Sequence, residues 1–269
     1  MVLFFVEPDR RDPLFTAGSA REEDPSLLKI GIVSDIHGNL EALETVLGSL
    51  QEYGVERILC LGDLVGYGPD PVACVERIMD TADIVVAGNH DQAVSGLIDM
   101  DRFNTQAREA IEWTRTQTTR EINDTLAGLP LTVSGDSMTA VHAAPFEPEA
   151  WHYLLTEAEA RRGFSFLKNP VCFVGHSHIP LIFIEDRDGN ITMETAASIH
   201  LEKDKRYIIN VGSVGQPRDN DARTCMGLWD TTASEFVLER LPYPVWLVQE
   251  KMARFELPVS LIERLSFGI

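Results

Sequence analysis

Five short segments carry side chains that commonly bind metal ions, and each follows a short apolar run. In chain order they are Asp35-Ile36-His37, Gly62-Asp63, Gly88-Asn89-His90-Asp91, His142 and Gly175-His176-Ser177-His178. In open α/β sheets, ligand sites form beyond the carboxyl ends of the strands, so these segments are expected to meet. Residues two apart in an extended chain point the same way, so both ligand-type residues of each D-x-H or H-x-H segment should face one site.

The residue types favour particular metals. Imidazole combined with carboxylate suits Mn, Fe, Ni or Zn better than Ca or Mg, and the lack of a thiolate cluster disfavours a structural zinc site. A single histidine is more often structural, but five of the seven histidines lie at equivalent strand ends, which favours a shared site. Two divalent cations bring four positive charges, of which Asp35 and Asp63 offset two and a bridging hydroxide a third. Such a site would attract an anionic phosphate.

Composition limits the class of partner. The 269 residues suffice for one sizeable α/β domain or two small ones, and the formal net charge is −19. A surface this acidic would repel the phosphate backbone of a nucleic acid. A long nucleic acid is therefore not expected as substrate. A small phosphorylated molecule is compatible with a locally positive site. The sequence does not indicate an oligomeric state.

Cysteine usage and hydropathy bear on the compartment. The four cysteines form no C-x-x-C pair, and Cys60 and Cys172 lie in apolar strand-like runs, which predicts buried free thiols and a reducing compartment. The apolar run at residues 1–6 is too short for a signal-peptide core. No other apolar segment is long enough to span a bilayer. A cytoplasmic protein without a membrane partner is therefore expected.

Apolar periodicity predicts a regular domain after an N-terminal extension over residues 1–27. Strands are predicted at 28–33, 57–61 and 83–87, with a helix from residue 40, capped by Asn39, and another at about 71–80. This order implies parallel pairing and right-handed crossovers. A long helix is predicted at about 104–127, then short strands near 139–141, 171–174, 181–184, 191–193, 207–209, 225–229 and 236–238, and closing helices at about 244–254 and 258–266.

Taken in order, the five segments resemble the calcineurin-like metallophosphoesterase superfamily. Its pattern of D-x-H, GD, GNH followed by D or E, a single H and GH-x-H is complete between Leu28 and about Asp219. Each motif is weak alone, whereas the ordered set of five is highly specific. The resemblance implies an α/β (α+β) fold: a four-layer α/β/β/α sandwich of the metallo-dependent phosphatase type. The metallophosphoesterase domain would cover residues 28–269, with the site at one sheet edge.

The resemblance also implies two divalent metal ions, with Mn favoured and Fe, Ni or Zn as alternatives. The expected ligands are Asp35, His37 and His178 on one ion, Asn89, His142 and His176 on the other, and Asp63 bridging both. A hydroxide between the ions would attack phosphorus. The expected catalytic residues are therefore Asp63, Asn89 and His90. His90 is expected to protonate the leaving alkoxide. The alternative role for His90 is a structural hydrogen bond.

Departures from the family pattern narrow the substrate. Ser/Thr protein phosphatases carry GD-x-VDRG, but Gly66 and Tyr67 replace the second acid and the phosphate-binding arginine, which disfavours that phosphoprotein phosphatase activity. The Gly-Tyr-Gly-Pro version and segment 210–219 resemble the small prokaryotic phosphodiesterase branch, although Val211 replaces the usual proline. Arg218 and Tyr67 are candidate substrate contacts. The alternatives are a structural salt bridge for Arg218 and a packed loop aromatic for Tyr67.

Two classes of function stay open. The first is a hydrolase of small phosphodiesters or phosphomonoesters, nucleotide-like molecules in particular, with a dinucleoside polyphosphate hydrolase or a nonspecific phosphatase as variants. The second is a non-catalytic interaction scaffold on the same fold. Loss of motif residues would favour the scaffold. Because His90 and all seven expected ligands are present, the enzyme is favoured.

Overall fold

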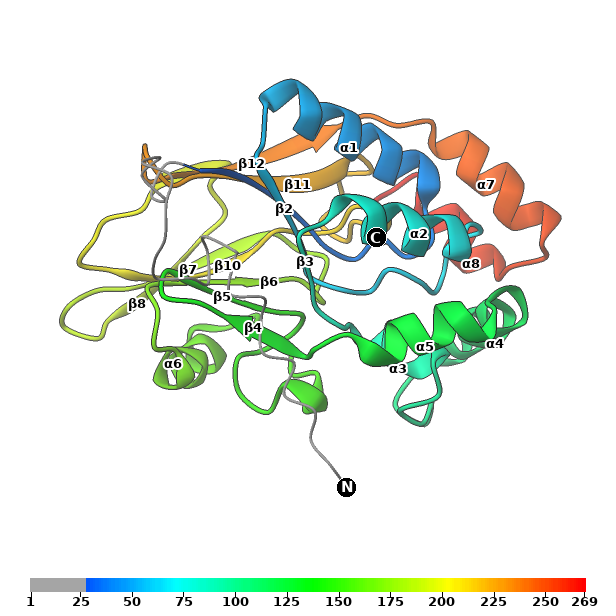
Figure 1. Cartoon of the computed structure of the whole chain (residues 1–269), viewed down its shortest axis with the longest axis horizontal. Helices are drawn as coiled ribbons and strands as arrows, with labels where there is room; N and C mark the ends of the chain where they lie inside the picture. Colours follow the sequence, from blue (N-terminus) through cyan, green and yellow to red (C-terminus); the bar gives the residue numbers. More distant parts are fainter. Residues whose placement is uncertain (1–27) are drawn as a thin grey trace, which may run out of the picture.

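Two six-stranded sheets form the centre of the molecule in the computed structural model, which describes residues 28–269 (Figure 1). In spatial order, the first sheet contains β3 (Ile84–Val85), β2 (Arg57–Cys60), β1 (Lys29–Val33), β11 (Thr224–Asp230), β12 (Glu235–Leu241) and β9 (Ser198–His200). The second contains β4 (Thr132–Ser134), β5 (Met138–Val141), β6 (Val171–Val174), β10 (Arg206–Asn210), β7 (Leu181–Glu185) and β8 (Ile191–Glu194). The extension predicted over residues 1–27 lies outside the described residues.

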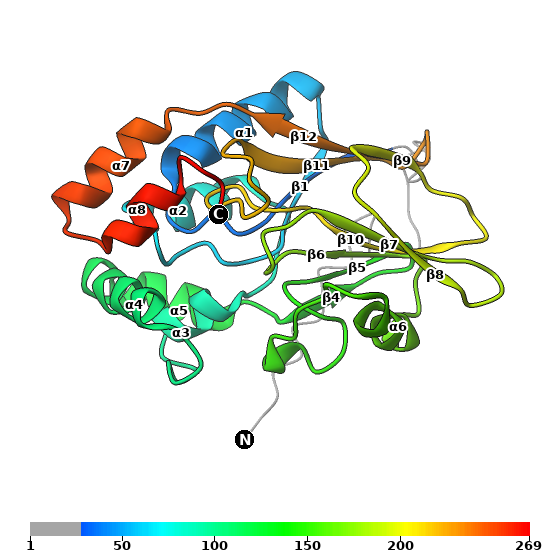
Figure 2. The ribbon, with the colours of Figure 1, turned by 180° about the vertical axis from the view of Figure 1, so that it is seen from behind.

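Helices cover the outer faces of both sheets. α1 (Leu40–Tyr53) and α2 (Pro71–Thr81) lie on the first sheet, and α6 (Glu157–Phe166) lies on the second (Figures 1 and 2). The remaining helices gather beyond one end of the sheets: α3 (Asn89–Val94), α4 (Thr105–Gln117), α5 (Arg120–Gly128), α7 (Val245–Arg254) and α8 (Val259–Arg264). A short 3-10 turn, Pro148–Ala150, precedes α6.

Three apolar cores separate four layers. Leu43 of α1 and Val33 of β1 belong to the core between the helices and the first sheet. Ile32 and Ile209 belong to the core between the two sheets, and Phe164 packs α6 on the second sheet. Neighbouring side chains on a strand point to opposite faces, so β1 contributes to two cores and reads as a continuous apolar run. The predicted four-layer α/β/β/α sandwich is confirmed.

Strand register explains why distant motifs meet at one edge. β1, β2 and β3 are parallel, as predicted, with Val33 opposite Cys60 and Cys60 opposite Val85. In the second sheet, β5 and β10 both pair in parallel with β6. Parallel strands that end in register deliver their following loops to the same edge. The motif segments begin within a few residues of these strand ends and therefore converge.

Some predicted elements were right and others were not. Asn39 caps α1, because its side chain accepts a hydrogen bond from the Ala42 amide at 3.1 Å. The single helix predicted at 104–127 is wrong: the chain leaves the helical conformation at Thr118, where ψ is 144°. Thr119 then caps a new helix, α5, by accepting from the amide of Ile122. β4, β9 and α6 were not predicted.

The four cysteines lie where the sequence predicts them. All four cysteines are buried with free thiols, as predicted, and burial raises the pKa of the Cys172 thiol well above its usual range. Such thiols are chemically inert packing residues. Within residues 28–269, every helix is too short or too polar to cross a membrane.

Candidate functional site

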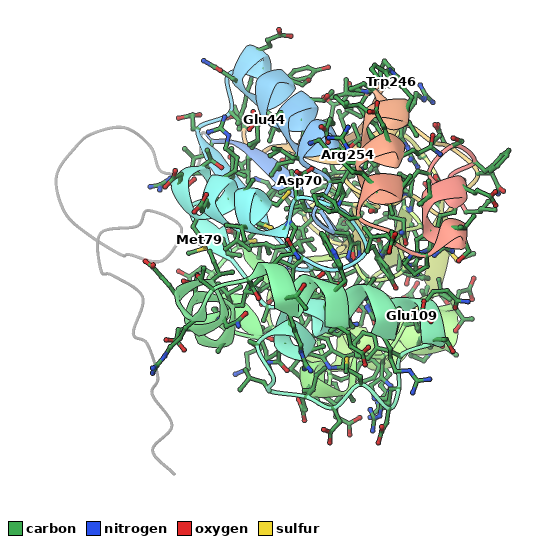
Figure 3. The ribbon with its side chains drawn as sticks, turned by 90° about the vertical axis from the view of Figure 1, so that its right-hand side faces the viewer. Glu44, Asp70, Met79, Glu109, Trp246 and Arg254 are labelled. Carbon is green, nitrogen blue, oxygen red and sulfur yellow. The ribbon has the colours of Figure 1, made fainter. Side chains whose placement is uncertain are left out.

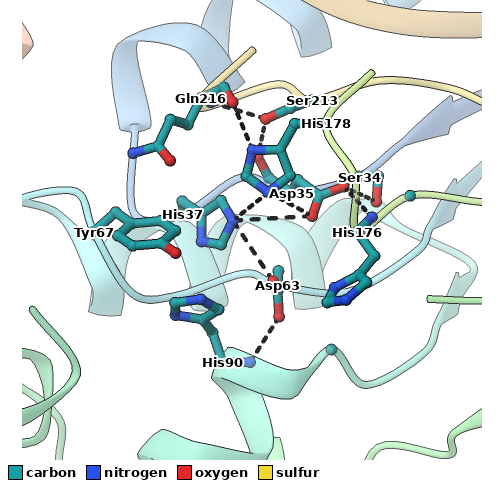
Figure 4. Close-up of polar contacts among 12 residues, drawn as sticks. Ser34, Asp35, His37, Asp63, Tyr67, His90, His176, His178, Ser213 and Gln216 are labelled. Atoms are coloured by element: carbon teal, nitrogen blue, oxygen red, sulfur yellow. Dashed lines mark hydrogen bonds and ion pairs between the residues drawn. The ribbon is translucent and has the colours of Figure 1, made fainter. Parts of the chain in front are cut away.

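Two groups of buried donor atoms lie where the parallel strands of the two sheets end, and Asp63 belongs to both groups. The first group contains Asp35, His37, Asp63 and His178, and the second contains Asp63, His142 and His176. Within each group, one donor atom from every residue lies within 4.8 Å of the others. Figure 4 shows the imidazoles of His37 and His178 turned toward Asp35 and Asp63. Six of the seven predicted ligands therefore converge, in the two groups that were expected.

The seventh predicted ligand, Asn89, begins α3 at the same edge. Its side chain is buried, and its Oδ1 has no hydrogen-bond partner within the described residues. The next residue, His90, donates its main-chain N–H to Asp63 Oδ1 at 2.8 Å, which fixes the first turn of α3 beside the shared carboxylate. Asn89 lines one cavity together with Asp63 and His176.

The backbone at these positions is not extended. The φ angles are 54° at Asp35, 50° at His37, 53° at Asp63, 66° at His176 and 60° at His178, all in the left-handed region that non-glycine residues rarely adopt. The side chains within each segment do face one site, but the extended geometry expected to bring them there is wrong. Tight left-handed turns do so instead, and conformational strain of this kind is typical of functional sites.

Hydrogen bonds fix one oxygen of Asp35 and leave the other turned into the site. Asp35 Oδ2 accepts from Ser34 Oγ at 2.7 Å and from the His176 amide at 3.0 Å. Asp35 Oδ1 lies 3.1 Å from His178 Nε2 but has no hydrogen-bond donor within the described residues. In Asp63, Oδ2 lies 3.3 Å from His142 Nε2 and 3.6 Å from His37 Nε2. One carboxylate oxygen of each aspartate therefore faces the imidazoles.

Main-chain carbonyls set the orientation of three imidazoles. The Nδ1 atoms of His37, His142 and His178 lie 3.1, 2.7 and 2.6 Å from the carbonyl oxygens of Val65, Leu61 and Gln216. In a neutral ring, Nδ1–H donates to the carbonyl and Nε2 keeps a bare lone pair. His37 Nε2 and His178 Nε2 then face each other at 3.1 Å with no proton to share. A cation between them would remove this repulsion.

The unsatisfied buried atoms also fit bound cations. Asp35 Oδ1, Asn89 Oδ1, His142 Nε2 and His176 Nε2 are buried and have no hydrogen-bond partner within the described residues. A buried polar atom without a partner costs about 1–3 kcal/mol, so four at one site call for an explanation. Nitrogen and oxygen donors in two groups match a pair of divalent transition-metal ions.

Burial and charge act in opposite directions on the donor groups. Burial lowers the pKa of His176 to about 3. Burial also works to lower the pKa of His142, but the Asp63 and Asp35 carboxylates outweigh it and raise that pKa to about 9. Burial works to raise the pKa of Asp63, yet His142 and other imidazoles hold it well below its usual range. A proton on His142 thus offsets carboxylate charge in the metal-free site, and a cation would replace it.

His90 lies beside the donor groups, and its ring makes no hydrogen bond to residues 28–269. Its imidazole is 4.8 Å from that of His37 and 4.5 Å from the Tyr67 ring, measured between centroids. Its Nδ1 is buried and unsatisfied within the described residues, so the structural hydrogen bond considered for this ring is not found there. A Cβ at Gly66 would lie 2.3 Å from that Nδ1, which makes glycine necessary at this position. The His90 ring is held by packing and is available to a substrate.

Asp91 is a positioning residue to which the sequence alone assigned no role. Its carboxylate accepts four main-chain N–H groups: from Asp63 at 2.8 Å, Leu64 at 2.9 Å, Val65 at 3.4 Å and Gly88 at 2.9 Å. It therefore ties the loop that carries Asp63 to the loop that carries Asn89. Burial and the nearby Asp63 raise its pKa to about 7, against the four N–H donors, which favour the anion. Its place directly after the GNH motif was the available signal.

A cavity of about 690 Å³ opens onto the site, and both candidate substrate contacts line it. Arg218 Nη2 donates to Gln216 Oε1 at 3.0 Å and lies 3.4 Å from the Tyr67 hydroxyl. Arg218 forms no salt bridge to an acidic side chain within the described residues, so that alternative is not found. Tyr67 is only 7% exposed and packs against His37 and His90, so it is a packed aromatic whose hydroxyl still reaches the cavity wall. Trp151 and Tyr153, which were not predicted, complete part of the wall.

Comparison with known proteins agrees with this geometry. The sequence model of the calcineurin-like phosphoesterase superfamily domain matches residues 28–234. The uncharacterized protein MJ0912 of Methanocaldococcus jannaschii is 39% identical over 243 residues, which cover 89% of this chain and 98% of that protein. A metallophosphoesterase from Sphaerobacter thermophilus is 38% identical, with a TM-score of 0.80 over 90% of this chain and 100% of that one.

A shorter similarity points to the same family. Phosphodiesterase YfcE of Escherichia coli K12 is 33% identical over 82 residues, which cover 27% of this chain and 45% of that protein. The match to the family model spans most of the chain and includes all five motif segments. The chain therefore belongs to the calcineurin-like phosphoesterase superfamily and is a metallophosphoesterase, a hydrolase of phosphoric esters.

Proposed function

We propose that this protein uses two divalent cations to hydrolyse small phosphodiesters, nucleotide-like molecules in particular. The observation that carries the proposal is the membership of Asp63 in both buried donor groups. A carboxylate common to two sites holds two cations close enough to act on one phosphate. Because the relative YfcE is named a phosphodiesterase, a diester is the first choice of substrate.

The donor atoms divide into two sets of ligands. One cation would be held by Asp35, His37 and His178, the other by Asn89, His142 and His176, with Asp63 shared. Mn is our first choice, with Fe, Ni and Zn as alternatives, because the donors are imidazole and carboxylate. When bound, the cations would supply an activated water and offset negative charge on the phosphate.

The chain itself provides orientation and a suitable charge. Main-chain carbonyls hold the imidazoles in one tautomer, and Asp91 fixes the loop of the shared carboxylate. Four neutral imidazoles and one amide add no charge to the site. Asp35 and Asp63 offset only two of the four positive charges that two cations carry, so an anionic phosphate is attracted into an otherwise acidic protein.

His90 is the residue we assign to the leaving group. Burial lowers its pKa to about 4, with Arg218 also contributing, so its ring is neutral near pH 7 while the pocket holds no anion. A negatively charged phosphate entering the pocket favours the protonated ring. His90 can then transfer its proton to the departing alkoxide.

The other hypotheses from the sequence are weaker. A non-catalytic scaffold has no need for four buried polar atoms that lack partners within residues 28–269 at the edge where the motifs meet. A phosphoprotein phosphatase of the GD-x-VDRG type lacks its arginine, because Tyr67 occupies that position. Phosphomonoesters and dinucleoside polyphosphates remain alternative substrates that a direct comparison of rates distinguishes.

The test compares esters on protein reconstituted with Mn, Fe, Ni or Zn. We expect two metal ions per chain and a higher kcat/KM on bis-p-nitrophenyl phosphate than on p-nitrophenyl phosphate or diadenosine polyphosphates. Asp63→Asn should lose turnover together with bound metal. His200→Asn, which replaces an exposed histidine on β9, should retain both. Absence of hydrolysis with all four metals, or equal rates in metal-free protein, would contradict the proposal.

A further inference from the structure

A second arginine reaches the cavity from the C-terminal helices. Arg264 is the last residue of α8 and lies beyond residue 234, where the match to the family model ends. It lines the same cavity as Arg218 and His90. Arg264 Nη1 donates to Gln216 Oε1 at 3.3 Å, and Arg218 Nη2 donates to the same oxygen at 3.0 Å. The two guanidinium groups therefore meet on one neutral acceptor.

Neither guanidinium has an acidic side chain as partner within residues 28–269. Within the described part of the chain, the other guanidinium hydrogen bonds run from Arg218 to the Tyr67 hydroxyl and from Arg264 to the main-chain oxygen of Ile269, and Arg218 Nε is buried with no partner. The acid next to Arg218, Asp219, pairs with Arg240 instead. Two adjacent cations that share one amide oxygen repel each other, and an anion would relieve that repulsion.

Charge effects on Arg264 are consistent with this geometry. Burial lowers the pKa of Arg264 from its usual value, and the neighbouring Arg218 adds to the effect. Three exposed acids, Asp99, Asp101 and Glu149, line the same cavity, but none forms an ion pair with either arginine within the described part of the chain. The guanidinium nitrogens that do not bond to Gln216, Tyr67 or Ile269 are thus left for a ligand.

The arginine pair lies beside the donor groups and not among them. Tyr67 contacts both: its ring centroid is 5.7 Å from the Arg218 guanidinium carbon and 4.6 Å from the His37 ring. Figure 4 shows Tyr67 and Gln216 on the same side of His37, away from Asp63. The Arg218 amide also donates to the carbonyl of His178 at 3.2 Å, which links its loop to the donor groups. An anion on the arginines would be a different group from the phosphate at the metal ligands.

We propose that Arg218 and Arg264 form a second anion subsite that binds a non-reacting phosphate of the substrate. The inference rests on the proposed function, because it names the substrate class of the same site: phosphodiesters that carry an additional phosphate group. Planar guanidinium groups suit the tetrahedral oxygens of phosphate, which they bind through paired N–H donors. The subsite makes the C-terminal helices a determinant of specificity.

The test uses two chromogenic esters that differ by one phosphate. Thymidine 5′-(p-nitrophenyl phosphate) has only the reacting group, and its 3′-phosphorylated form carries one more. We expect the metal-loaded protein to favour the 3′-phosphorylated ester at least tenfold in kcat/KM, mainly through KM. Arg264→Gln should reduce this ratio about tenfold, since a hydrogen bond to a charged group contributes that much. Arg264→Lys should reduce it less.

Arg254→Gln is the matched control. Arg254 is the last residue of α7 (Figure 3), is exposed and pairs with Glu250, so the variant removes the same charge outside the cavity. It should leave the ratio unchanged. Calorimetry on metal-free protein gives an independent measure: Arg264→Gln should weaken thymidine 3′,5′-bisphosphate binding about tenfold relative to thymidine 5′-monophosphate.

The outcomes separate the two proposals. Cleavage of both esters at similar rates by the unmodified protein would overturn the subsite and leave the proposed function standing. An Arg264→Gln variant that loses activity equally on both esters would show a structural role and also overturn it. If neither ester is cleaved with any metal, the proposed function fails, and calorimetry alone decides the subsite: equal binding of the two nucleotides would refute it.

Discussion

Gly66 is the position where the smallest change should disturb His90 the most. A Cβ there would lie 2.3 Å from His90 Nδ1, whereas ordinary van der Waals contact begins at 3.4 Å. The difference, about 1.1 Å, is the distance that the imidazole or the loop must move. Gly66 also has a φ of 86°, so alanine adds backbone strain of roughly 1–3 kcal/mol.

We expect Gly66→Ala to lower kcat about 100-fold, because a displacement of about 1 Å in a reacting group can cost that much. Both metals should remain, since the nearest atoms that the new Cβ would meet all belong to His90. The loss should be larger for a dinucleotide, whose alkoxide leaving group needs a proton, than for bis-p-nitrophenyl phosphate, whose leaving group is weakly basic. Steady-state kinetics on both esters, with metal analysis of the same samples, measures this.

Gly189→Ala separates backbone strain from the contact with His90. Gly189 has a similar φ of 78°, lies in the turn between β7 and β8, and has no atom within 4 Å of an added Cβ. The Gly189→Ala variant should be less stable than the unmodified protein but should hydrolyse both esters at the same rate. Full turnover of Gly66→Ala on the dinucleotide would refute the role of His90, as would an equal loss on both esters.

Three further predictions concern stability. Asp91→Asn leaves two of the four main-chain N–H donors facing an amide NH2 group. The free energy of unfolding, measured by urea denaturation, should fall by about 2–4 kcal/mol, and the metal content should fall as well. An unchanged midpoint would contradict the positioning role. In the folded, metal-free protein His90 and His176 have pKa values near 4 and 3, below the usual value of about 6.5. The free energy of unfolding should therefore fall as pH drops from about 6.5 toward 4, by up to about 1.4 kcal/mol per pH unit for each of these histidines. His142, with a folded pKa of about 9, has the opposite sign: its contribution to stability is complete below about pH 6.5 and is lost as pH rises through 9. Urea titrations should therefore find maximal stability near pH 6.5. Chelation should lower the melting temperature by about 10–20 °C if each of the two metals is present at about 100 times its Kd, and calorimetry that shows no shift would contradict metal binding by the folded state.

Much of the fold was predictable because strand patterns and motif positions are local. The apolar run of β1 and the segment that begins at Asp35 are adjacent in sequence, so the position of the ligands at strand ends could be inferred. The break between α4 and α5 was missed because apolar periodicity continues on both sides of Thr118, while the cap at Thr119 depends on one side chain.

The parts of the site that escaped prediction depend on contacts between distant residues. The left-handed turn at His37 follows from main-chain bonds to the loop that carries Asp63, which no local pattern encodes. Arg264 reaches Gln216 across 48 residues of sequence, through the packing of α7 and α8 against α4. Nothing in the residues around Arg264 distinguishes it from an exposed arginine such as Arg254, so only the three-dimensional arrangement assigns it to the cavity.

Anomalous diffraction from crystals of the Mn-loaded protein tests the central claim most directly. We expect two peaks roughly 3.5–4 Å apart, both in contact with the Asp63 carboxylate, one beside His37 and His178 and the other beside His142 and His176. A single peak, or a second cation that does not touch Asp63, would contradict the shared-carboxylate centre on which the proposed chemistry depends.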